Sequence, residues 1–366
     1  MKTVVISGIN LFEGGPLSVY KDCLDNIVRK GIYKENKIII FVHKKQLFNE
    51  YDKYVTIIEL PKARKGYIYR VWYEYFYFYT YSKDKNIDIW ISLHDITPNV
   101  RASERYVYCH NPSPFMRLDL KDLRYSYKNF LFSLFYKYLY KINIKKNTAV
   151  IVQQDWIRQE FFNLYNINNI IVARPTFYIN NFKESKCTKK NKDAIFRFIY
   201  PAFPRVFKNF EIICEASKIL EEKGISNFEV LLTLDGTENK YSSDLTNKYS
   251  NINSVKFIGL QNRENIYRLY NEVDCMIFPS KIETWGLPIS EFKFTKKPII
   301  VVRLPYARET IGEYDKVCFF DSNNVKELAK LMEEQIYNIG EYEICREPII
   351  EEPYCCDWSE LLKTIL

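Results

Sequence analysis

Residues 275–291 read CMIFPSKIETWGLPISE, and this stretch predicts more of the fold than any other part of the chain. The apolar run 275–278 predicts a buried strand, and Pro279 ends it. Gly286 followed by Pro288 is typical of the start of a helix. The pattern therefore predicts a strand, a turn and a helix, with free backbone N–H groups and a positive dipole end at the turn, which together form an anion site.

Two carboxylates flank this predicted turn. Glu283 lies in the loop and Glu291 lies on the first turns of the helix, eight residues further on. A phosphate at the helix start would have one carboxylate on each side, and each carboxylate could accept hydroxyl hydrogen bonds worth about 1.5–3 kcal/mol. A capped helix with two surface glutamates is the alternative interpretation.

Working outward, short apolar runs alternate with helical patterns along the whole chain. Continuous Val, Ile and Phe runs are typical of strands buried on both faces, hence of parallel sheets with helical crossovers. We therefore predict an α/β protein with two doubly wound, Rossmann-like domains. The predicted strands are 4–7, 38–42, 54–59, 87–92, 105–109, 149–153, 170–173, 197–200, 229–233, 255–257, 275–278 and 299–302.

One segment interrupts this alternation. Residues 183–193 read KESKCTKKNKD, which is polar, basic and without periodicity, as expected of a solvated linker. The predicted division is an N-terminal domain at 1–182, this linker, a C-terminal domain at 194–345, and a helical segment at 346–366 that packs back toward the N-terminal domain. Ligands are expected at the carboxyl ends of the strands and in the cleft between the domains.

A second anion-binding pattern follows the strand predicted at 197–200. Arg205 and Lys208 stand three residues apart in PRVFKN, just before a helix predicted at 210–222. Positive side chains are unfavourable at a helix N-terminus unless an anion is bound there. Arg supplies a bidentate fork and Lys a mobile charge, so the pair favours phosphate.

Two patterns in the first half could also contact a ligand. Gly14 and Gly15, in EGGPLS after the first strand, allow close approach of the backbone, and a plain turn is the alternative. His110, in YVYCHNPSPF, follows a predicted strand and is placed to contact a substrate hydroxyl. His94 in SLHD is placed similarly and is the weaker candidate.

Composition limits the remaining classes of function. The formal charge of +8 suits nucleic acid, anionic lipid or phosphorylated small molecules. The nine Cys include no C-x-x-C and the three His show no ligand spacing with them, so we expect reduced thiols and no zinc site. No long apolar stretch or secretory leader is visible, which predicts a cytoplasmic protein.

Residues 123–146, LRYSYKNFLFSLFYKYLYKINIKK, combine basic and aromatic residues at helical spacing. Packed helices are one interpretation. The other is a basic face that rests on an anionic membrane, peripherally and on the inner side of the cell membrane.

Taken together, these motifs resemble the retaining glycosyltransferases of family 4, which belong to the glycosyl transferases group 1 and have the GT-B fold. Glu283 and Glu291 match the Glu-x7-Glu pattern of that family, in the context ETWGLPISE. GGPLS, YCHNPSPF, IVQQDWIR, PRVFKN and VKFIGLQNRENIYRLYNEVDCMIFPS occur in the order of the family's motifs. Phe292 and Trp285 depart from its usual residues and could reshape a sugar pocket.

The resemblance implies two domains that face each other across a cleft, with an acceptor in the first and a nucleotide-diphosphate sugar in the second. Glu283 would contact the donor sugar, Glu291 the ribose, and His110 the sugar or the reacting face. The remaining residues implied at the donor are Arg205 and Lys208 at the diphosphate, Gly14 and Gly15 closing over it, Ile258, Gly259, Leu260 and Gln261 at the base, and Trp285, Gly286 and Leu287 through backbone N–H groups.

The implied reaction is hexosyl or related transfer to a glycan or lipid-linked acceptor in surface polysaccharide synthesis. No D-x-D pair is present, so we expect no metal and no cofactor besides the donor. Two other functions stay open: a sugar-nucleotide epimerase of the same fold, and a basic nucleic-acid-binding protein. The second would need a continuous stripe of Lys and Arg with stacking aromatics, and the prediction is that the chain binds no nucleic acid.

Overall fold

The computed structural model describes residues 1–116, 125, 135–175 and 195–366, which belong to two compact units. Of the described residues, unit 1 comprises 1–116, 135–175 and 350–366, and unit 2 comprises 125 and 195–349. The predicted linker at 183–193 and most of the first half of segment 123–146 lie outside the described residues.

Unit 1 contains one sheet of eight strands in the order β15-β7-β6-β5-β4-β1-β2-β3, and all neighbouring strands are parallel. Apolar runs buried on both faces explain this arrangement, as in other parallel sheets. The strands are β1 (Lys2–Gly8), β2 (Asn36–Val42), β3 (Thr56–Glu59), β4 (Ile89–Ser92), β5 (Glu104–Cys109), β6 (Ala149–Val152), β7 (Ile170–Ala173) and β15 (Tyr354–Cys355).

Alternate residues of β1 bury opposite faces of this sheet, as the period of two requires. Val4 and Ile6 pack in the cluster that includes α1 and the C-terminal helix α13, whereas Val5 packs with Phe78 and its neighbours. The helical segments of unit 1 are α1 (Gly14–Arg29), α2 (Ile32–Glu35), α3 (Tyr67–Trp72), the π-helical turn η3 (Tyr73–Tyr77), α4 (Phe78–Lys83), α6 (Asp155–Tyr165) and α13 (Trp358–Ile365), with 3-10 turns at Lys45–Tyr51, Pro61–Arg64, Ser113–Phe115 and Ile144–Lys146.

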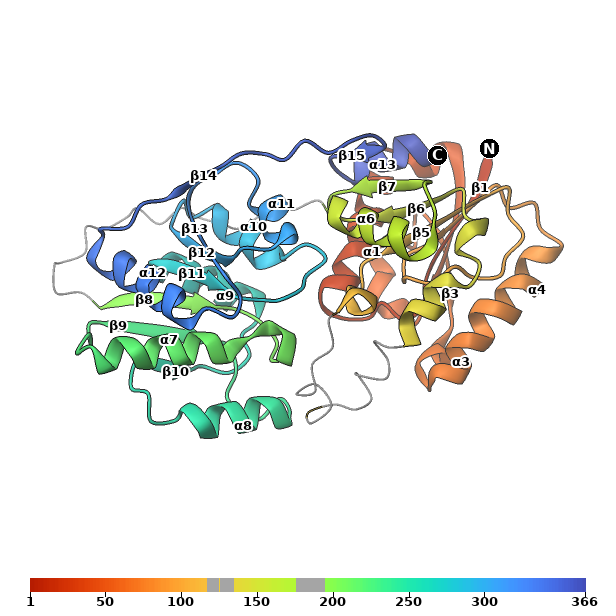
Figure 1. The fold of residues 1–366 in the computed structure, drawn as a ribbon. Helices are drawn as coiled ribbons and strands as arrows, with labels where there is room; N and C mark the ends of the chain where they lie inside the picture. Colours follow the sequence, from red (N-terminus) through yellow and green to blue (C-terminus); the bar gives the residue numbers. More distant parts are fainter. Residues whose placement is uncertain (117–124, 126–134, 176–194) are drawn as a thin grey trace. The chain divides into compact units, whose positions relative to one another are not determined.

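Unit 2 contains a seven-stranded sheet in the order β10-β9-β8-β11-β12-β13-β14, in which β14 alone runs antiparallel to its neighbour. Helices α7 and α12 pack side by side against it (Figure 1). The strands are β8 (Phe196–Tyr200), β9 (Phe228–Leu232), β10 (Val255–Phe257), β11 (Cys275–Phe278), β12 (Ile299–Val302), β13 (Tyr314–Phe320) and β14 (Glu343–Cys345). The helices are the 3-10 turn η6 (Val206–Lys208), α7 (Phe210–Glu222), α8 (Lys240–Tyr249), α9 (Arg263–Glu272), α10 (Leu287–Lys293), α11 (Pro305–Ile311) and α12 (Val325–Tyr337).

The α/β prediction with two doubly wound, mainly parallel sheets is confirmed. In each unit the parallel strands end at one edge, so the loops that follow them lie at that edge. In unit 1 these loops follow β1, β4 and β5, and in unit 2 they follow β10, β9, β8 and β11. The candidate residues of both units lie in these loops or directly after them.

We predict that the C-terminal segment stabilises unit 1. The buried indole of Trp358 stacks on Tyr108 of β5, with ring centroids 5.1 Å apart. Trp358→Ala should lower the free energy of unfolding by about 3–5 kcal/mol, the usual cost of deleting a buried aromatic ring. Urea unfolding followed by circular dichroism measures it, with Ile349→Ala at a 97% exposed position as the control. A loss below about 1 kcal/mol would contradict this role.

Candidate functional site

Two loops of unit 2 are joined directly at the carboxyl ends of the neighbouring strands β8 and β11. The backbone N–H of Lys281 donates to the carbonyl oxygen of Phe207 at 2.8 Å. Asn209 is buried with φ 59°, a left-handed conformation that Asn tolerates better than most residues. Its side-chain amide donates to the carbonyl oxygen of Pro279 at 3.4 Å, in the loop after β11, and to that of Ser322 at 2.9 Å, in the loop after β13 (Tyr314–Phe320).

This junction brings Lys208 and Glu283 together. The ammonium of Lys208 donates to Oε1 of Glu283, and their side chains are only 17% and 15% exposed. The carbonyl oxygen of Lys208 accepts a hydrogen bond of 2.9 Å from the hydroxyl of Tyr200. A largely buried ion pair depends strongly on both partners, because removal of one leaves the other charge without compensation.

Arg205 lies three residues before Lys208 and is exposed. Its guanidinium carbon is 5.9 Å from the ring centroid of Phe203, and among the described residues no carboxylate forms an ion pair with it. Two cations and one carboxylate therefore lie at the end of β8 and β11.

The turn before α10 is built around Gly286. Its φ of 92° disfavours side chains, and a Cβ there would lie 3.3 Å from Cδ1 of Ile289. The indole of Trp285 is buried and donates to Oγ of Ser290 at 2.9 Å, while the hydroxyl of Thr310 donates to the carbonyl oxygen of Trp285. The indole of Trp285 thus supports the turn from inside and is not exposed to a ligand. The prediction for these backbone groups stays a prediction.

Glu291 has different partners from Glu283. Its Oε1 lies 3.3 Å from Nη2 of Arg263 and accepts a hydrogen bond of 3.2 Å from the hydroxyl of Tyr267, both on α9. Burial raises the pKa of the Glu291 carboxyl, and the charge of Arg263 opposes that shift. Arg263 and Tyr267 were missed by the sequence reasoning, although Arg263 opens α9 directly after the predicted base-binding loop.

That loop, residues 258–261, follows β10. Gly259 has φ 67°, and a Cβ at this position would lie 3.0 Å from Oδ2 of Asp235 in the loop after β9. The amide of Gln261 donates to the carbonyl oxygen of Ile258 at 2.6 Å, and Leu260 is 53% exposed. These contacts hold the loop in a defined shape beside the loop after β9.

In unit 1 the loop after β1 leads into α1. Gly14 is exposed with φ 62°, and a Cβ there would meet no atom within 4 Å, so there is open space beside its backbone, whereas Gly15 is half-buried. Glu13 precedes the helix without a side-chain capping bond.

The structure separates the two candidate histidines of unit 1. His94 is fully buried with Nε2 2.9 Å from Oε1 of Glu74, which lies on η3. Burial raises the pKa of Glu74 to about 8. Burial also lowers the pKa of His94, and the charge of Arg70 lowers it further. Both shifts favour the neutral forms of the two side chains, and the fully buried His94 belongs to the core of unit 1.

His110 lies at the end of β5 with a side chain 9% exposed, and its Nε2 is 4.0 Å from Oδ2 of Asp95. Asp95 was missed by the sequence reasoning, which stopped at its neighbour His94. A charged residue three positions after a buried strand was the available signal.

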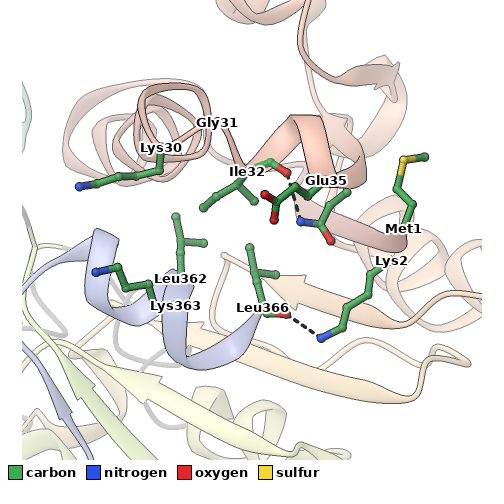
Figure 2. A pocket seen from close by; sticks show the side chains of 10 residues that line it. Met1, Lys2, Lys30, Gly31, Ile32, Glu35, Leu362, Lys363 and Leu366 are labelled. Carbon is green, nitrogen blue, oxygen red and sulfur yellow. Dashed lines mark hydrogen bonds between the residues drawn. The ribbon is translucent and has the colours of Figure 1, made fainter.

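A cavity of about 390 Å³ in unit 1 lies elsewhere. It is lined by Lys2, Asn36 and Leu366 among others, and the first two stand at the amino ends of β1 and β2 (Figure 2). This is the sheet edge opposite to Gly14 and His110, so the cavity contains none of the candidate residues. Within the described ranges, no group of three or more His, Cys, Asp or Glu is placed to hold a metal, and no helix is long and apolar enough to cross a membrane.

The chain is similar to known proteins in sequence and in fold. Residues 180–347 match the family model described as Glycosyl transferases group 1, so the chain carries a domain of this kind. This stretch contains the whole junction of β8 and β11. The O-antigen chain mannosyltransferase RfbU of Salmonella typhimurium is 20% identical over 232 residues, and the match spans 61% of this chain and 62% of RfbU.

Two solved structures share the architecture. A glycosyltransferase from Rickettsia africae has a TM-score of 0.64 at 17% identity, with 93% of this chain and 89% of that chain covered. HepE of Anabaena, in complex with UDP-glucose, has a TM-score of 0.59 at 13% identity, with 92% and 90% covered. These likenesses confirm the predicted fold class, the GT-B fold with two Rossmann-like units.

Proposed function

We propose that this protein is a retaining glycosyltransferase that moves a sugar from a nucleotide-diphosphate sugar to a glycan or lipid-linked acceptor in surface polysaccharide synthesis. The observation that carries the proposal is the Lys208–Glu283 ion pair beside the exposed Arg205, at the carboxyl ends of β8 and β11. The group 1 domain match, the name of RfbU and the UDP-glucose bound in HepE support the donor class.

The chemistry of the donor fits this arrangement of charges. A diphosphate would pair with Arg205 and Lys208, and it would release Glu283 to accept hydrogen bonds from sugar hydroxyls. Cleavage of the sugar–phosphate bond builds negative charge on the leaving diphosphate, which the two cations would stabilise. We assign no protein base, since a diphosphate oxygen would take the acceptor's proton as the acceptor attacks the same face. Proton NMR of the product's anomeric centre tests retention.

The other proposed contacts are those that the family resemblance implies. Glu291 would bind the ribose hydroxyls and residues 258–261 the base, with backbone N–H groups at 285–287 on sugar and phosphate. Gly14 and Gly15 would approach the diphosphate, and His110 the sugar. We propose that no metal takes part, so donor binding should persist in EDTA.

Two alternative functions are compatible with part of these observations. A sugar-nucleotide epimerase would need several titratable groups at the site, and the neutral, buried His94–Glu74 pair removes one candidate. A nucleic-acid-binding protein would use the charge of +8. Calorimetry distinguishes the two functions: a nucleic-acid-binding protein would bind single-stranded RNA, whereas a transferase would bind a nucleotide sugar.

We predict that the two cations govern nucleotide affinity. A thermal-shift screen of UDP-, GDP- and ADP-sugars first identifies the donor, because ligands of the folded state raise the melting temperature. Calorimetry with the matching nucleoside diphosphate should then show affinity lower by about 100-fold or more in Arg205→Ala/Lys208→Ala, since each charge-assisted contact contributes about 1.5–3 kcal/mol. Arg268→Ala/Lys330→Ala, two exposed cations of the same unit, is the matched control. Equal affinities in the two double variants count against the site.

We further propose peripheral association with an anionic membrane on its cytoplasmic side. The predicted segment 123–146 is described only in part, but α3 offers a related surface in unit 1. Ile68, Trp72 and Phe76 repeat at helical spacing and are 84%, 49% and 62% exposed, and the exposed Lys62 and Lys65 precede them. Apolar side chains beside lysines are typical of helices at a lipid interface.

The membrane proposal predicts flotation with vesicles that contain phosphatidylglycerol, and weak flotation with pure phosphatidylcholine. Ile68→Ser/Trp72→Ser/Phe76→Ser should reduce the bound fraction at least several-fold, whereas Tyr337→Ser/Ile339→Ser, at exposed apolar positions of unit 2, should not. Lys137→Glu/Lys141→Glu tests the described part of segment 123–146. Equal flotation of the wild-type protein with both kinds of vesicle would contradict the proposal.

A further inference from the structure

Asp95, in the loop after β4, is held in an unusual backbone conformation. Its φ of 77° lies in the left-handed region that residues other than Gly rarely adopt, and its side chain is buried. Its backbone N–H donates to the carbonyl oxygen of Tyr108 at 3.2 Å, so the loop is attached to the neighbouring strand β5. Such strained residues cluster at functional sites, and the surrounding contacts must fix them.

The carboxylate of Asp95 reaches the turn that follows β5. Its Oδ1 accepts hydrogen bonds from the backbone N–H groups of His110 at 2.8 Å and Asn111 at 3.1 Å, and from the hydroxyl of Tyr140 at 3.0 Å. Its Oδ2 accepts from the hydroxyl of Tyr136 at 3.4 Å. One buried carboxylate therefore organises the backbone of the two residues that open the HNPSP turn.

The polar groups around the Asp95 carboxylate are hydrogen-bond donors. Burial, together with the charge of Asp95, raises the pKa of Tyr140 and of Tyr136, so both hydroxyls keep their protons. The guanidinium of Arg70 donates to the carbonyl oxygen of the preceding residue, His94, at 2.9 Å. The Asp95 carboxylate is therefore held in place by hydrogen bonds from both sides.

The same carboxylate faces the ring of His110. Nε2 of His110 lies 4.0 Å from Oδ2 of Asp95, and Nδ1 is buried with no hydrogen-bond partner among the described residues. A carboxylate accepts protons and donates none, so it favours the tautomer whose proton is on the facing nitrogen. The lone pair is then on Nδ1, the ring nitrogen that faces away from the carboxylate.

We propose that Asp95 is the positioning residue of His110: it holds the backbone of the His110–Asn111 turn and fixes the imidazole with its proton on Nε2. This inference rests on the proposed function, in which His110 contacts the sugar, and extends it to a residue outside the motifs quoted above for the resemblance. Asp95 acts through His110 and touches no substrate itself.

Two substitutions separate the backbone role from the role at the ring. Asp95→Asn tolerates the left-handed conformation, and its amide oxygen can still accept from both backbone N–H groups. Its NH₂ group, however, would donate to Nε2 and move the imidazole proton to Nδ1. Asp95→Gly accepts the backbone conformation and removes both roles. Asp88→Asn is the matched control, because the Asp88 carboxylate accepts the backbone N–H of Thr3 at 2.7 Å at the opposite end of β4.

Histidine NMR gives a readout that is independent of activity. The chain has only three His, so long-range ¹H–¹⁵N spectra of histidine-labelled protein at alkaline pH contain few signals, and His110→Gln assigns the relevant one. We expect the proton of His110 on Nε2 in the wild type and in Asp88→Asn, and on Nδ1 or exchanging in Asp95→Asn. A wild-type proton on Nδ1, or the same spectrum in Asp95→Asn, would overturn the proposal.

Enzyme kinetics provide a second test of the role of Asp95. Release of nucleoside diphosphate from UDP-glucose and GDP-mannose should fall by roughly 10- to 100-fold in kcat for Asp95→Asn, the usual size of effects on outer partners of a functional His. Nucleoside diphosphate affinity should stay unchanged, because neither Asp95 nor His110 has a proposed contact with the diphosphate. Wild-type kcat in Asp95→Asn would overturn the positioning role. If neither the wild type nor any variant turns over any sugar nucleotide of the thermal-shift screen while the tautomer changes as expected, the proposed function fails and the Asp95–His110 relation stands.

Discussion

The ion pair between Lys208 and Glu283 connects the two loops on which the donor-site proposal depends. It forms because β8 and β11 are neighbours in a parallel sheet, so that the loops after them start at the same edge. The left-handed Asn209 and the hydrogen bond from Lys281 to Phe207 fix the spacing of the loops. Each partner is largely buried and would be costly without the other. A ligand that carries both phosphate and hydroxyl groups can satisfy both at once, whereas a simple anion can satisfy only the lysine.

In unit 1, too, a side chain joins two loops at the carboxyl edge of the sheet, although the residues differ. There the loops after β4 and β5 are joined by one carboxylate, that of Asp95, which accepts the backbone N–H groups of the His110–Asn111 turn. The neighbouring His94 turns inward to Glu74 and is kept neutral by burial. Two adjacent residues of one loop thus have opposite roles: His94 stabilises the core, and Asp95 organises the surface turn.

The sequence predicted the architecture well because the fold follows from local apolar patterns. Every strand predicted is present with ends that differ by two residues or fewer, and α7 has the predicted bounds. β13 was missed because Asp315 and Lys316 interrupt its apolar run, and β14 and β15 because they are too short to show a pattern. The site was predicted less completely, since Lys208 and Glu283 were both chosen but their pairing spans 75 residues. Asp95, Arg263 and Tyr267 are polar residues whose partners lie far along the chain, which no local pattern reveals.

The central claim is that Glu283 exchanges Lys208 for the donor sugar during the reaction. The most direct test is the rate of nucleoside diphosphate release from the cognate sugar nucleotide in Glu283→Gln, alongside its urea unfolding curve. The account predicts that turnover is abolished while the fold is retained and the nucleoside diphosphate still binds, because Lys208 and Arg205 remain. Turnover close to that of the wild type in the folded variant would contradict it.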